Sequence, residues 1–202
     1  MDSQEWDRRY AGADLVWTAE PNRFVVAELA DLRPGRALDL GAGEGRNAVW
    51  LASRGWRVTA VDFSAVGLGK GRRLAQAHGV AVDWICADLR DYQPEAQWFQ
   101  LVLVAYLQLR AADLDGVLRR AAAALAPEGM LLVVGHDVTN LTEGVGGPQD
   151  QAVLYTPEAI TQSLQGLTVL RAERVRRPVT VPGAAEGGRG EAVDTLVRAV
   201  RA

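Results

Sequence analysis

The chain has 202 residues, of which 49% are hydrophobic and 23% are charged, and its net charge is −3. This length suits one domain with a sizeable buried core, and the slightly acidic balance argues against a nucleic-acid partner, which requires a basic face. A single cysteine, Cys86, excludes an intrachain disulfide and a cysteine-based metal site. The polar N-terminus and the shortness of every apolar run predict neither a signal peptide nor a membrane partner, so we expect a cytoplasmic protein.

Residues 1–33 predict helices that close over one edge of a sheet. The segment is polar but contains Tyr10 and Trp17, and a start signal at 18–21 places Pro21 in the first turn of a helix. Aromatic side chains in such a segment either pack over the sheet edge or contact a ligand, and composition alone does not choose between the two.

Residues 37–64 contain the most informative pattern of the chain. They predict a buried strand at 37–40, a helix at 46–52 and a second strand at 57–61. Gly41, Gly43 and Gly45 follow the first strand at every second position, where the backbone can turn tightly and approach a ligand without a Cβ in the way. The second strand ends on Asp62. A unit of this kind binds an adenosine-containing ligand at the carboxyl edge of a parallel sheet.

The spacing of the glycines distinguishes between ligands. A dinucleotide fingerprint requires a small residue where this chain has Arg46. The pattern D-x-G-x-G-x-G, which begins at Asp39, instead resembles motif I of the class I S-adenosylmethionine (SAM)-dependent methyltransferases. More narrowly, the stretch LGAGEGRN at 40–47 is similar to the tellurite-resistance and thiopurine-type small-molecule methyltransferases.

This resemblance implies a set of cofactor contacts. The loop backbone at 41–43 would approach the methionyl and ribose parts of SAM, and Asp62 would accept hydrogen bonds from the ribose hydroxyls. Asp88, just past the third strand, would accept from the adenine amino group; outside this context it would be read as a solvated turn residue. The end of the fourth strand would offer carbonyl groups to the methionine ammonium. The cofactor-binding residues that we expect are Trp17, Asp39, Gly41, Ala42, Gly43, Arg46, Asn47, Asp62, Phe63, Ser64, Asp88, Leu89, Ala105 and Tyr106.

The chain beyond residue 64 predicts alternating helices and strands. The helices lie at 64–78 and 112–125, and the strands lie at 80–86, 99–104 and 130–134. Gly67, Gly69 and Gly71 each weaken the first of these helices by about 1 kcal/mol relative to alanine, which predicts a soft surface helix. The continuous apolar run at 99–104 is typical of a parallel strand that is buried on both faces.

A second informative stretch follows the strand at 130–134. His136, Asp137 and Asn140 lie at the edge of the sheet where ligands bind, so His136 is either a general base or a residue that only shapes the pocket. The three form too short a cluster for a complete metal site, and we expect no metal. The loop at 141–156 is long enough to act as a lid. The substrate contacts that we expect are Tyr10, Asp137, Asn140 and Tyr155.

The C-terminal part predicts how the sheet ends. A helix starts at Pro157, and strands at 167–175 and 193–200 follow, joined by the polar segment 183–190. Two strands joined without a helix must be antiparallel. The expected fold is a doubly wound, Rossmann-like α/β domain with a seven-stranded, mostly parallel sheet and an antiparallel C-terminal hairpin. We divide this single domain into N-terminal lid helices (1–33), a cofactor-binding core (37–135), an active-site loop (136–156) and a C-terminal helix and hairpin (157–202).

The predicted function is methyl transfer from SAM to a small-molecule acceptor, with S-adenosylhomocysteine as product. Transfer requires a nucleophile held near the methyl group without water, and His136 becomes the leading base only if the acceptor is a hydroxyl. Tellurite or selenite, a thiol, a halide, a phenol and a natural-product hydroxyl remain open as acceptors. The alternatives are a SAM- or nucleotide-binding regulatory module without turnover and, less favoured because of Arg46, a nicotinamide-dependent reductase. The expected partner is a small-molecule substrate, and a homodimer is left open.

Overall fold

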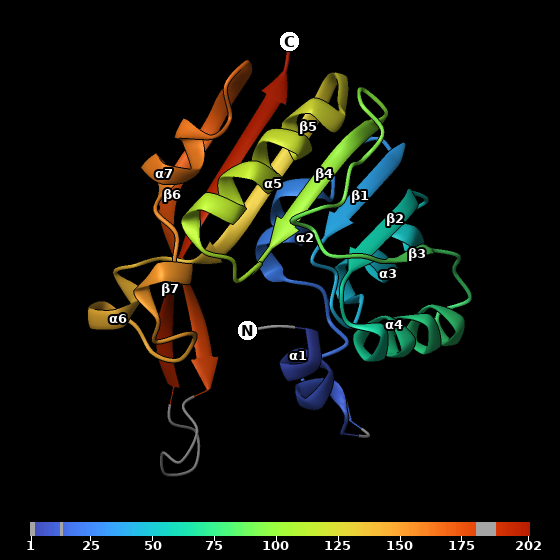
Figure 1. The fold of residues 1–202 in the computed structure, drawn as a ribbon, viewed down its shortest axis with the longest axis horizontal. Helices are drawn as coiled ribbons and strands as arrows, with labels where there is room; N and C mark the ends of the chain where they lie inside the picture. Colours follow the sequence, from blue (N-terminus) through green and yellow to red (C-terminus); the bar gives the residue numbers. More distant parts are fainter. Residues whose placement is uncertain (1–2, 13, 181–188) are drawn as a thin grey trace.

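The computed structural model describes residues 3–12, 14–180 and 189–202, which are built around a seven-stranded sheet (Figure 1). The strands follow the order β3-β2-β1-β4-β5-β7-β6. They are β1 (Arg36–Leu40), β2 (Arg57–Asp62), β3 (Asp83–Cys86), β4 (Phe99–Ala105), β5 (Leu125–His136), β6 (Leu167–Thr180) and β7 (Arg189–Arg201).

The first five strands are parallel, and the last two form an antiparallel hairpin. Ala37 of β1 pairs with Val58 of β2 on one side and with Leu101 of β4 on the other, whereas β7 runs antiparallel to both β5 and β6. The chain moves outward from β1 to β3 and then returns to β4, so the strand order reverses between β1 and β4. Open α/β sheets bind ligands at this point, beyond the carboxyl ends of the strands. The predicted fold class is confirmed.

Helices cover both faces of the sheet: in Figure 1, α5 lies in front of β4 and β5, and α2 and α3 lie behind. The helices are α1 (Ser3–Tyr10), α2 (Arg23–Leu29), α3 (Arg46–Ser53), α4 (Ala65–Ala77), α5 (Ala111–Ala124), α6 (Asn140–Glu143) and α7 (Pro157–Gln162), with a 3₁₀ turn at Gln151–Val153. Successive side chains of a strand point to opposite faces, so Leu101 and Leu103 pack with α2 and α3, while Val102 and Val104 pack with α5.

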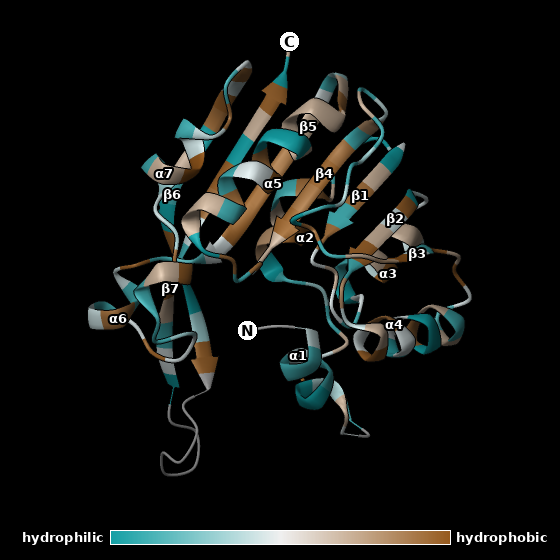
Figure 2. Ribbon diagram, viewed as in Figure 1, coloured by the Kyte–Doolittle hydropathy of each residue, from teal (hydrophilic) through white to brown (hydrophobic). Residues whose placement is uncertain are grey.

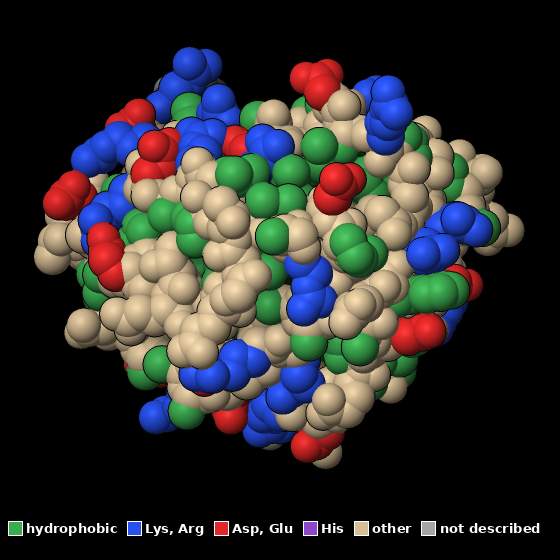
Figure 3. Space-filling model, turned by 90° about the horizontal axis from the view of Figure 1, so that it is seen from above, with side chains coloured by type: hydrophobic (Ala, Val, Ile, Leu, Met, Phe, Trp, Pro, Cys, Tyr) green, Lys and Arg blue, Asp and Glu red, His purple; other side chains and the backbone are tan. Residues whose placement is uncertain are grey.

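The central strands are the most hydrophobic part of the molecule (Figure 2), and the four side chains at 101–104 are fully buried. The edge strand β6 is instead rich in arginine, and charged edge strands resist pairing with other chains. On the face shown in Figure 3, basic and acidic side chains are interspersed. Within the described residues, no helix combines the length and the apolar character needed to cross a bilayer.

Some element boundaries differ from the prediction for local reasons. α2 begins at Arg23, because Asn22 is its cap: the Asn22 side chain accepts hydrogen bonds from the amides of Phe24 and Val25, and Pro21 lies outside the helix. β5 begins at Leu125 rather than at 130. Residues 127–129, which were predicted to form a turn, form a bulge in the pairing of β5 with β4.

The C-terminal hairpin is longer than predicted. β6 runs to Thr180 and β7 begins at Arg189, so both strands continue past the parallel part of the sheet (Figure 1). Residues 183–188 of the predicted connection lie outside the described residues, and residues 189–190 already belong to β7. The extra length brings the end of β6 to the carboxyl edge of the sheet.

Two of the three glycines of α4, Gly67 and Gly71, are packing positions, and for these two the prediction of a soft surface helix was wrong. Gly67 and Gly71 are buried. A Cβ on Gly71 would lie 2.6 Å from the ring of Trp84, and a Cβ on Gly67 would lie 3.1 Å from the carbonyl oxygen of Gly43. The helix therefore presses directly against the loop that follows β1.

Replacing Gly71 by alanine should destabilise the protein, because the added methyl group would overlap the ring of Trp84. Overpacking of this kind costs about 1–3 kcal/mol of unfolding free energy. Gly69 lies on the same helix but has no atom within 4 Å of an added Cβ, so Gly69→Ala should stabilise the protein by up to about 1 kcal/mol. Urea unfolding measures both changes, and equal stabilities of the two variants would contradict the packing role of Gly71.

Candidate active site

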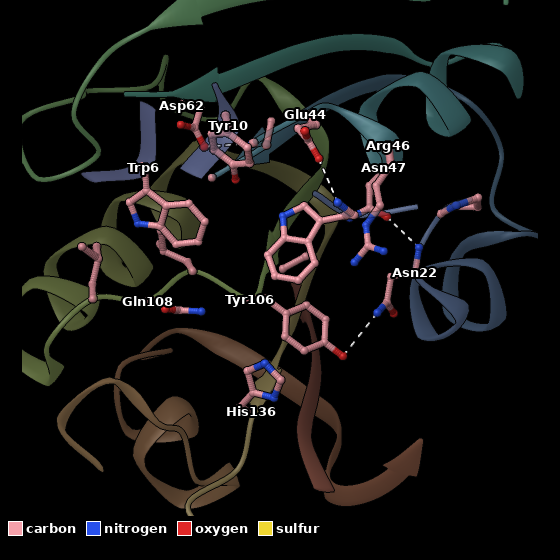
Figure 4. A pocket seen from close by; sticks show the side chains of 18 of the residues that line it. Trp6, Tyr10, Asn22, Glu44, Arg46, Asn47, Asp62, Tyr106, Gln108 and His136 are labelled. Atoms are coloured by element: carbon pink, nitrogen blue, oxygen red, sulfur yellow. Dashed lines mark hydrogen bonds between the residues drawn. The ribbon is translucent and has the colours of Figure 1, made fainter. Parts of the chain in front are cut away.

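A cavity of about 330 Å³, a volume typical of small-ligand sites, lies at the carboxyl ends of the parallel strands (Figure 4). The N-terminal segment contributes Trp6, Tyr10, Trp17, Pro21, Asn22 and Arg23. The glycine loop and α3 contribute Gly41, Ala42, Gly43, Glu44, Arg46 and Asn47. The strand ends contribute Asp62, Phe63, Ala105, Tyr106, Leu107, Gln108, Leu109, His136, Arg177 and Pro178.

The glycine loop depends on left-handed backbone angles. Gly41 and Gly43 have φ angles of 81° and 55°, which residues with a side chain rarely adopt. The amide of Gly43 donates a hydrogen bond of 2.8 Å to Oδ2 of Asp62, which ties the loop to the tip of β2. A Cβ on Gly43 would lie 2.8 Å from the hydroxyl of Tyr10. Bare backbone therefore forms this wall of the cavity, with Tyr10 packed against it.

Asp62 is buried at the end of β2 but keeps capacity for a ligand. Its Oδ1 accepts a hydrogen bond of 2.8 Å from the amide of Ser64, and each carboxylate oxygen retains a further lone pair. Burial raises the pKa of Asp62, and the backbone hydrogen bonds from Ser64 and Gly43 partly offset that effect. Ser64 was expected at the cofactor; it instead caps α4 and donates to Asp7 at 2.5 Å.

Asp39, near the end of β1, is a buried carboxylate without support. Only 1% of it is exposed, and neither oxygen has a hydrogen-bond partner among the described residues. Burial, reinforced by the charge of Asp62, raises the pKa of Asp39 to about 7, although Arg46 acts in the opposite direction. Asp39 does not line the cavity, so it would influence a ligand through its charge.

α3 begins at the glycine loop and presents two polar side chains to the cavity. Oδ1 of Asn47 accepts a hydrogen bond of 2.9 Å from the amide of Asn22 and so fixes the start of α2 (Figure 4). The guanidinium of Arg46 makes no hydrogen bond or ion pair to a described residue, and burial lowers the pKa of Arg46. A half-buried cation with no hydrogen-bond partner among the described residues is suited to an anionic group of a ligand.

Glu44 holds the N-terminal segment in place, and the sequence analysis missed it. Its carboxylate accepts hydrogen bonds of 3.0 Å from the amides of Val16 and Trp17 and pairs with Lys70 at 3.0 Å. Glu44 and Lys70 are only 3% and 4% exposed. The contact joins the glycine loop, α4 and the N-terminal segment, and it places Trp17 at the cavity. The signal available in the sequence was an acid between two glycines of an otherwise small-residue motif.

The opposite wall is a hydrogen-bond network around Asp194. Its Oδ2 accepts from the hydroxyl of Tyr106 at 2.7 Å and from Nε of Arg177 at 2.9 Å. The Tyr106 hydroxyl also accepts from Asn22 at 3.3 Å (Figure 4). Burial raises the pKa of Tyr106, and the charge of Asp194 reinforces the effect, so this hydroxyl stays protonated. His136 adjoins the network, with Nδ1 3.4 Å from Oδ1 of Asp194.

Sequence analysis missed Asp194 and Arg177, because both come from the hairpin. Neither residue belongs to a local motif, and only the register of β5, β6 and β7 brings them beside His136 and Tyr106.

Most of the expected site residues do meet at the cavity. These are Tyr10, Trp17, Gly41, Ala42, Gly43, Arg46, Asn47, Asp62, Phe63, Ala105, Tyr106 and His136.

Asp88 and Leu89 lie outside the cavity lining. Both carboxylate oxygens of Asp88 accept hydrogen bonds from the guanidinium of Arg90, and this pairing lowers the pKa of Asp88. Leu89 is buried in the hydrophobic cluster under α5. The adenine contact of Asp88 stays a prediction, and Leu89 is a core residue in this structure.

Asp137 is structural, contrary to the expectation that it contacts substrate. It has no exposed surface. Its oxygens accept hydrogen bonds from Thr195 at 2.6 Å, from Thr139 at 2.8 Å and from Arg174 at 3.0 Å, so they have protein partners instead of a ligand. These bonds outweigh burial and hold the pKa of Asp137 below its usual range. No group of three or more His, Cys, Asp or Glu side chains that could hold a metal occurs in the described part of the chain.

Asn140 and Tyr155 are also structural, and neither lines the cavity. Oδ1 of Asn140 accepts from the amide of Val193 at 2.7 Å, and its Nδ2 donates to the carbonyl of Gly146 at 2.8 Å. The hydroxyl of Tyr155 donates to the carbonyl of Leu107. These bonds pin the loop at 141–156 to the sheet, whereas the sequence suggested a lid.

Residues 37–129 match the family described as methyltransferase domain. This match supports an assignment to the class I SAM-dependent methyltransferases. SAM is the cofactor of this class, and the matched segment begins at the strand that leads into the glycine loop.

Two relatives and one solved structure illustrate how this chain compares with known proteins. The demethylmenaquinone methyltransferase of Thermus thermophilus is 34% identical over 125 residues, which are 61% of this chain and 55% of that protein. The ubiquinone biosynthesis O-methyltransferase of Methylocella silvestris is 32% identical over 110 residues, which are 54% of this chain and 42% of that protein. The chain therefore spans about half the length of the curated relatives it matches.

The solved structure is the N-methyltransferase NodS of Bradyrhizobium japonicum in complex with S-adenosylhomocysteine. It aligns with a TM-score of 0.68 at 20% identity and covers 98% of this chain and 97% of NodS. Likeness at this level of identity concerns the fold. The fold of this chain is thus shared over nearly its whole length with a protein solved in complex with S-adenosylhomocysteine.

Asp39→Asn should remove a pH dependence of stability. The pKa of Asp39 rises from an ordinary value of 3.8 to about 7 on folding, so the fold favours the protonated acid. That stabilisation is complete below the unfolded pKa and is lost as pH rises through about 7. Each pKa unit corresponds to about 1.4 kcal/mol, so the wild type should lose up to about 4 kcal/mol from this group between about pH 4 and pH 8.

Chemical unfolding across this pH range compares the two proteins, with Asp113→Asn as the control, because Asp113 is exposed on α5. The difference between wild type and Asp39→Asn should grow with pH, while Asp113→Asn should follow the wild type. Parallel curves for wild type and Asp39→Asn would show that Asp39 is ionised at no cost in the folded protein.

Proposed function

We propose that this chain transfers a methyl group from SAM to a small-molecule acceptor. The observation that carries the proposal is the cavity at the switch point. The glycine loop, the carboxylate of Asp62 and the guanidinium of Arg46, which has no hydrogen bond to a described residue, line one space there. The family match at 37–129 includes all three features. A volume of about 330 Å³ suits a small ligand.

The lining residues fit SAM at several points. The spare lone pairs of Asp62 would accept from the ribose hydroxyls, and the bare backbone of Gly41 and Gly43 leaves room for the methionyl part. Arg46 would pair with the carboxylate and thereby gain the partner that it lacks. Ala105, at the end of β4, would offer its carbonyl to the ammonium. When bound, SAM supplies a methyl group on a positively charged sulfur.

The acceptor would occupy the side of the cavity lined by Tyr106, Gln108 and His136 (Figure 4). Oε1 of Gln108 is buried and has no hydrogen-bond partner among the described residues, so a donor on the ligand would complete it. Tyr10 was expected at the substrate. It stacks on Trp6 with ring centres 5.4 Å apart and lies beside the glycine loop, so we assign it to the cofactor side.

The chain would promote the reaction mainly by positioning and by excluding water. The Glu44 contact keeps Trp17 and the preceding residues over the cofactor side, and Tyr106 and His136 close the other side. A nucleophile held about 3–3.5 Å from the carbon that it attacks gains most of the advantage that orientation provides. A site enclosed in this way also replaces water by fixed protein groups.

Asp62→Ala should weaken binding of SAM and S-adenosylhomocysteine at least about 10-fold, because hydrogen bonds to a charged group contribute about 1.5–3 kcal/mol. Asp113→Ala, on the exposed side of α5, is the matched control and should bind as the wild type does. Calorimetric titration measures both, with NAD(H) as a second ligand. Tight binding of NAD(H) without binding of SAM would overturn the assignment of the cofactor.

Wild-type protein should also release S-adenosylhomocysteine when small-molecule acceptors are supplied with SAM, and Asp62→Ala should not. Mass spectrometry of the acceptor and the cofactor product follows the transfer. Binding of SAM without turnover on any acceptor would indicate a regulatory module that senses the cofactor instead of an enzyme.

A further inference from the structure

Two buried polar atoms on the acceptor side lack a hydrogen-bond partner among the described residues. They are Nδ1 of His136 and Oδ1 of Asp194, and they lie 3.4 Å apart, so a small shift would bring them into a hydrogen bond. The two residues are directly opposite each other on β5 and β7. Asp194 has no exposed surface, whereas the His136 side chain is 14% exposed and lines the cavity.

The chemistry of Asp194 leaves one role for Oδ1. Its Oδ2 already accepts two hydrogen bonds, from Tyr106 and from Arg177. Burial alone would raise the pKa of Asp194, but the nearby His136 and the hydrogen bonds from Arg177 and Tyr106 outweigh it and hold the pKa below its usual range. Asp194 is therefore a carboxylate, and Oδ1 can only accept a hydrogen bond.

A carboxylate at this position determines where the proton of His136 resides. Because Asp194 has no proton to offer, a hydrogen bond across this gap requires the hydrogen on Nδ1, and in a neutral imidazole that leaves the lone pair on Nε2. Nδ1 also faces the loop after β5, where a Cβ on Gly147 would lie 2.9 Å from it. Nε2 is the other ring nitrogen, and the His136 side chain lines the cavity next to Tyr106 (Figure 4).

The remaining groups around the ring do not compete with Asp194 for this proton. The ring of Tyr106 meets His136 edge-on, with ring centres 4.9 Å apart, and its hydroxyl is committed to Asp194. Arg177 is bound to the same carboxylate, and Arg46 lines the same cavity. The neighbouring Asp137 is bonded to Thr139, Thr195 and Arg174.

We propose that Asp194 positions His136 as the general base of the transfer and that the acceptor is a small molecule with a weakly acidic hydroxyl. The inference rests on the proposed function and names its substrate class. Thiols ionise near neutral pH and metalloid oxyanions already carry a lone pair, so neither needs a base, whereas phenols and alcohols hold their proton until a base removes it. A buried His–Asp pair on the acceptor side therefore points to an O–H group, and Gln108 is placed to accept from a second donor on the same molecule.

The step balances without a further reactant. The acceptor oxygen forms a bond to the methyl carbon as its proton moves to Nε2 of His136. The sulfur–methyl bond breaks, and its electron pair stays on sulfur, which becomes neutral. The positive charge thus passes to the imidazolium of His136, which the carboxylate of Asp194 stabilises until the proton leaves to solvent.

Nitrogen NMR of the free protein tests the position of the proton, because it does not require cofactor or acceptor. The chain has only two histidines, so His78→Gln leaves the signals of His136 alone. Long-range ¹H–¹⁵N correlation at pH 7.5 should show the Nδ1–H tautomer in the wild type. In Asp194→Asn, Tyr106 and Arg177 still need an acceptor, so the amide oxygen should turn to them and its NH₂ group to Nδ1, which moves the proton to Nε2.

Asp137→Asn is the matched control, because it removes an equally buried carboxylate that is bonded elsewhere, and it should keep the wild-type tautomer. An Nε2–H tautomer in the wild type, or an unchanged tautomer in Asp194→Asn, would overturn the positioning role. If Asp194→Asn does not fold, the tautomer of the wild type decides the matter by itself.

Methylation of phenol, catechol, thiophenol and selenite by the wild type and by His136→Gln tests the acceptor class. We expect methylation of phenol or catechol, with a loss of about 100-fold or more in His136→Gln, as removal of a general base produces. Transfer only to thiophenol or selenite, or to none of the hydroxyl compounds, counts against this class. Failure of SAM to bind would count against the proposed function instead, and it would leave the tautomer result in force.

Discussion

The hydrogen bond from the amide of Gly43 to Asp62 is the contact on which the cavity depends. It joins the loop after β1 to the tip of β2 and requires a left-handed angle that glycine adopts easily. The same loop carries Glu44, which forms an ion pair with Lys70 and accepts hydrogen bonds from the amides of Val16 and Trp17. One tight turn therefore shapes the floor of the cofactor side and also holds the segment that covers it.

The residues on the cofactor side could be predicted because they come from one contiguous stretch of sequence. The residues on the acceptor side could not, because they meet only through the pairing of distant strands. The strand, loop, helix and second strand at 37–64 are contiguous, so their spacing alone indicated how Asp62 meets the loop. Asp194 becomes a neighbour of His136 only when β7 pairs with β5 in one particular register. A strand shifted by one residue would turn its other face to the cavity, and no local pattern specifies that register.

The error over Asp137 has a similar origin. The sequence suggested that the fifth strand ends at 134, so His136 and Asp137 were both expected in a loop that faces the ligand. The strand in fact continues to His136, and consecutive side chains of extended backbone point to opposite sides. His136 therefore lines the cavity while Asp137 is buried. Two glycines of α4 were misjudged because helix propensity does not register a distant ring such as that of Trp84.

Tyr106 combines an unusual backbone angle with a hydroxyl that organises the acceptor side. Its φ of 56° is costly for a residue with a side chain, by about 1–3 kcal/mol, yet its hydroxyl links Asn22 to Asp194. Glycine at this position would relieve the backbone strain, but it would remove the hydroxyl that joins Asn22 to Asp194. Glycine would also remove an aromatic ring that packs against the core, and this loss offsets the relieved strain. The unusual backbone angle is therefore retained at a residue whose side chain both packs and organises the acceptor side.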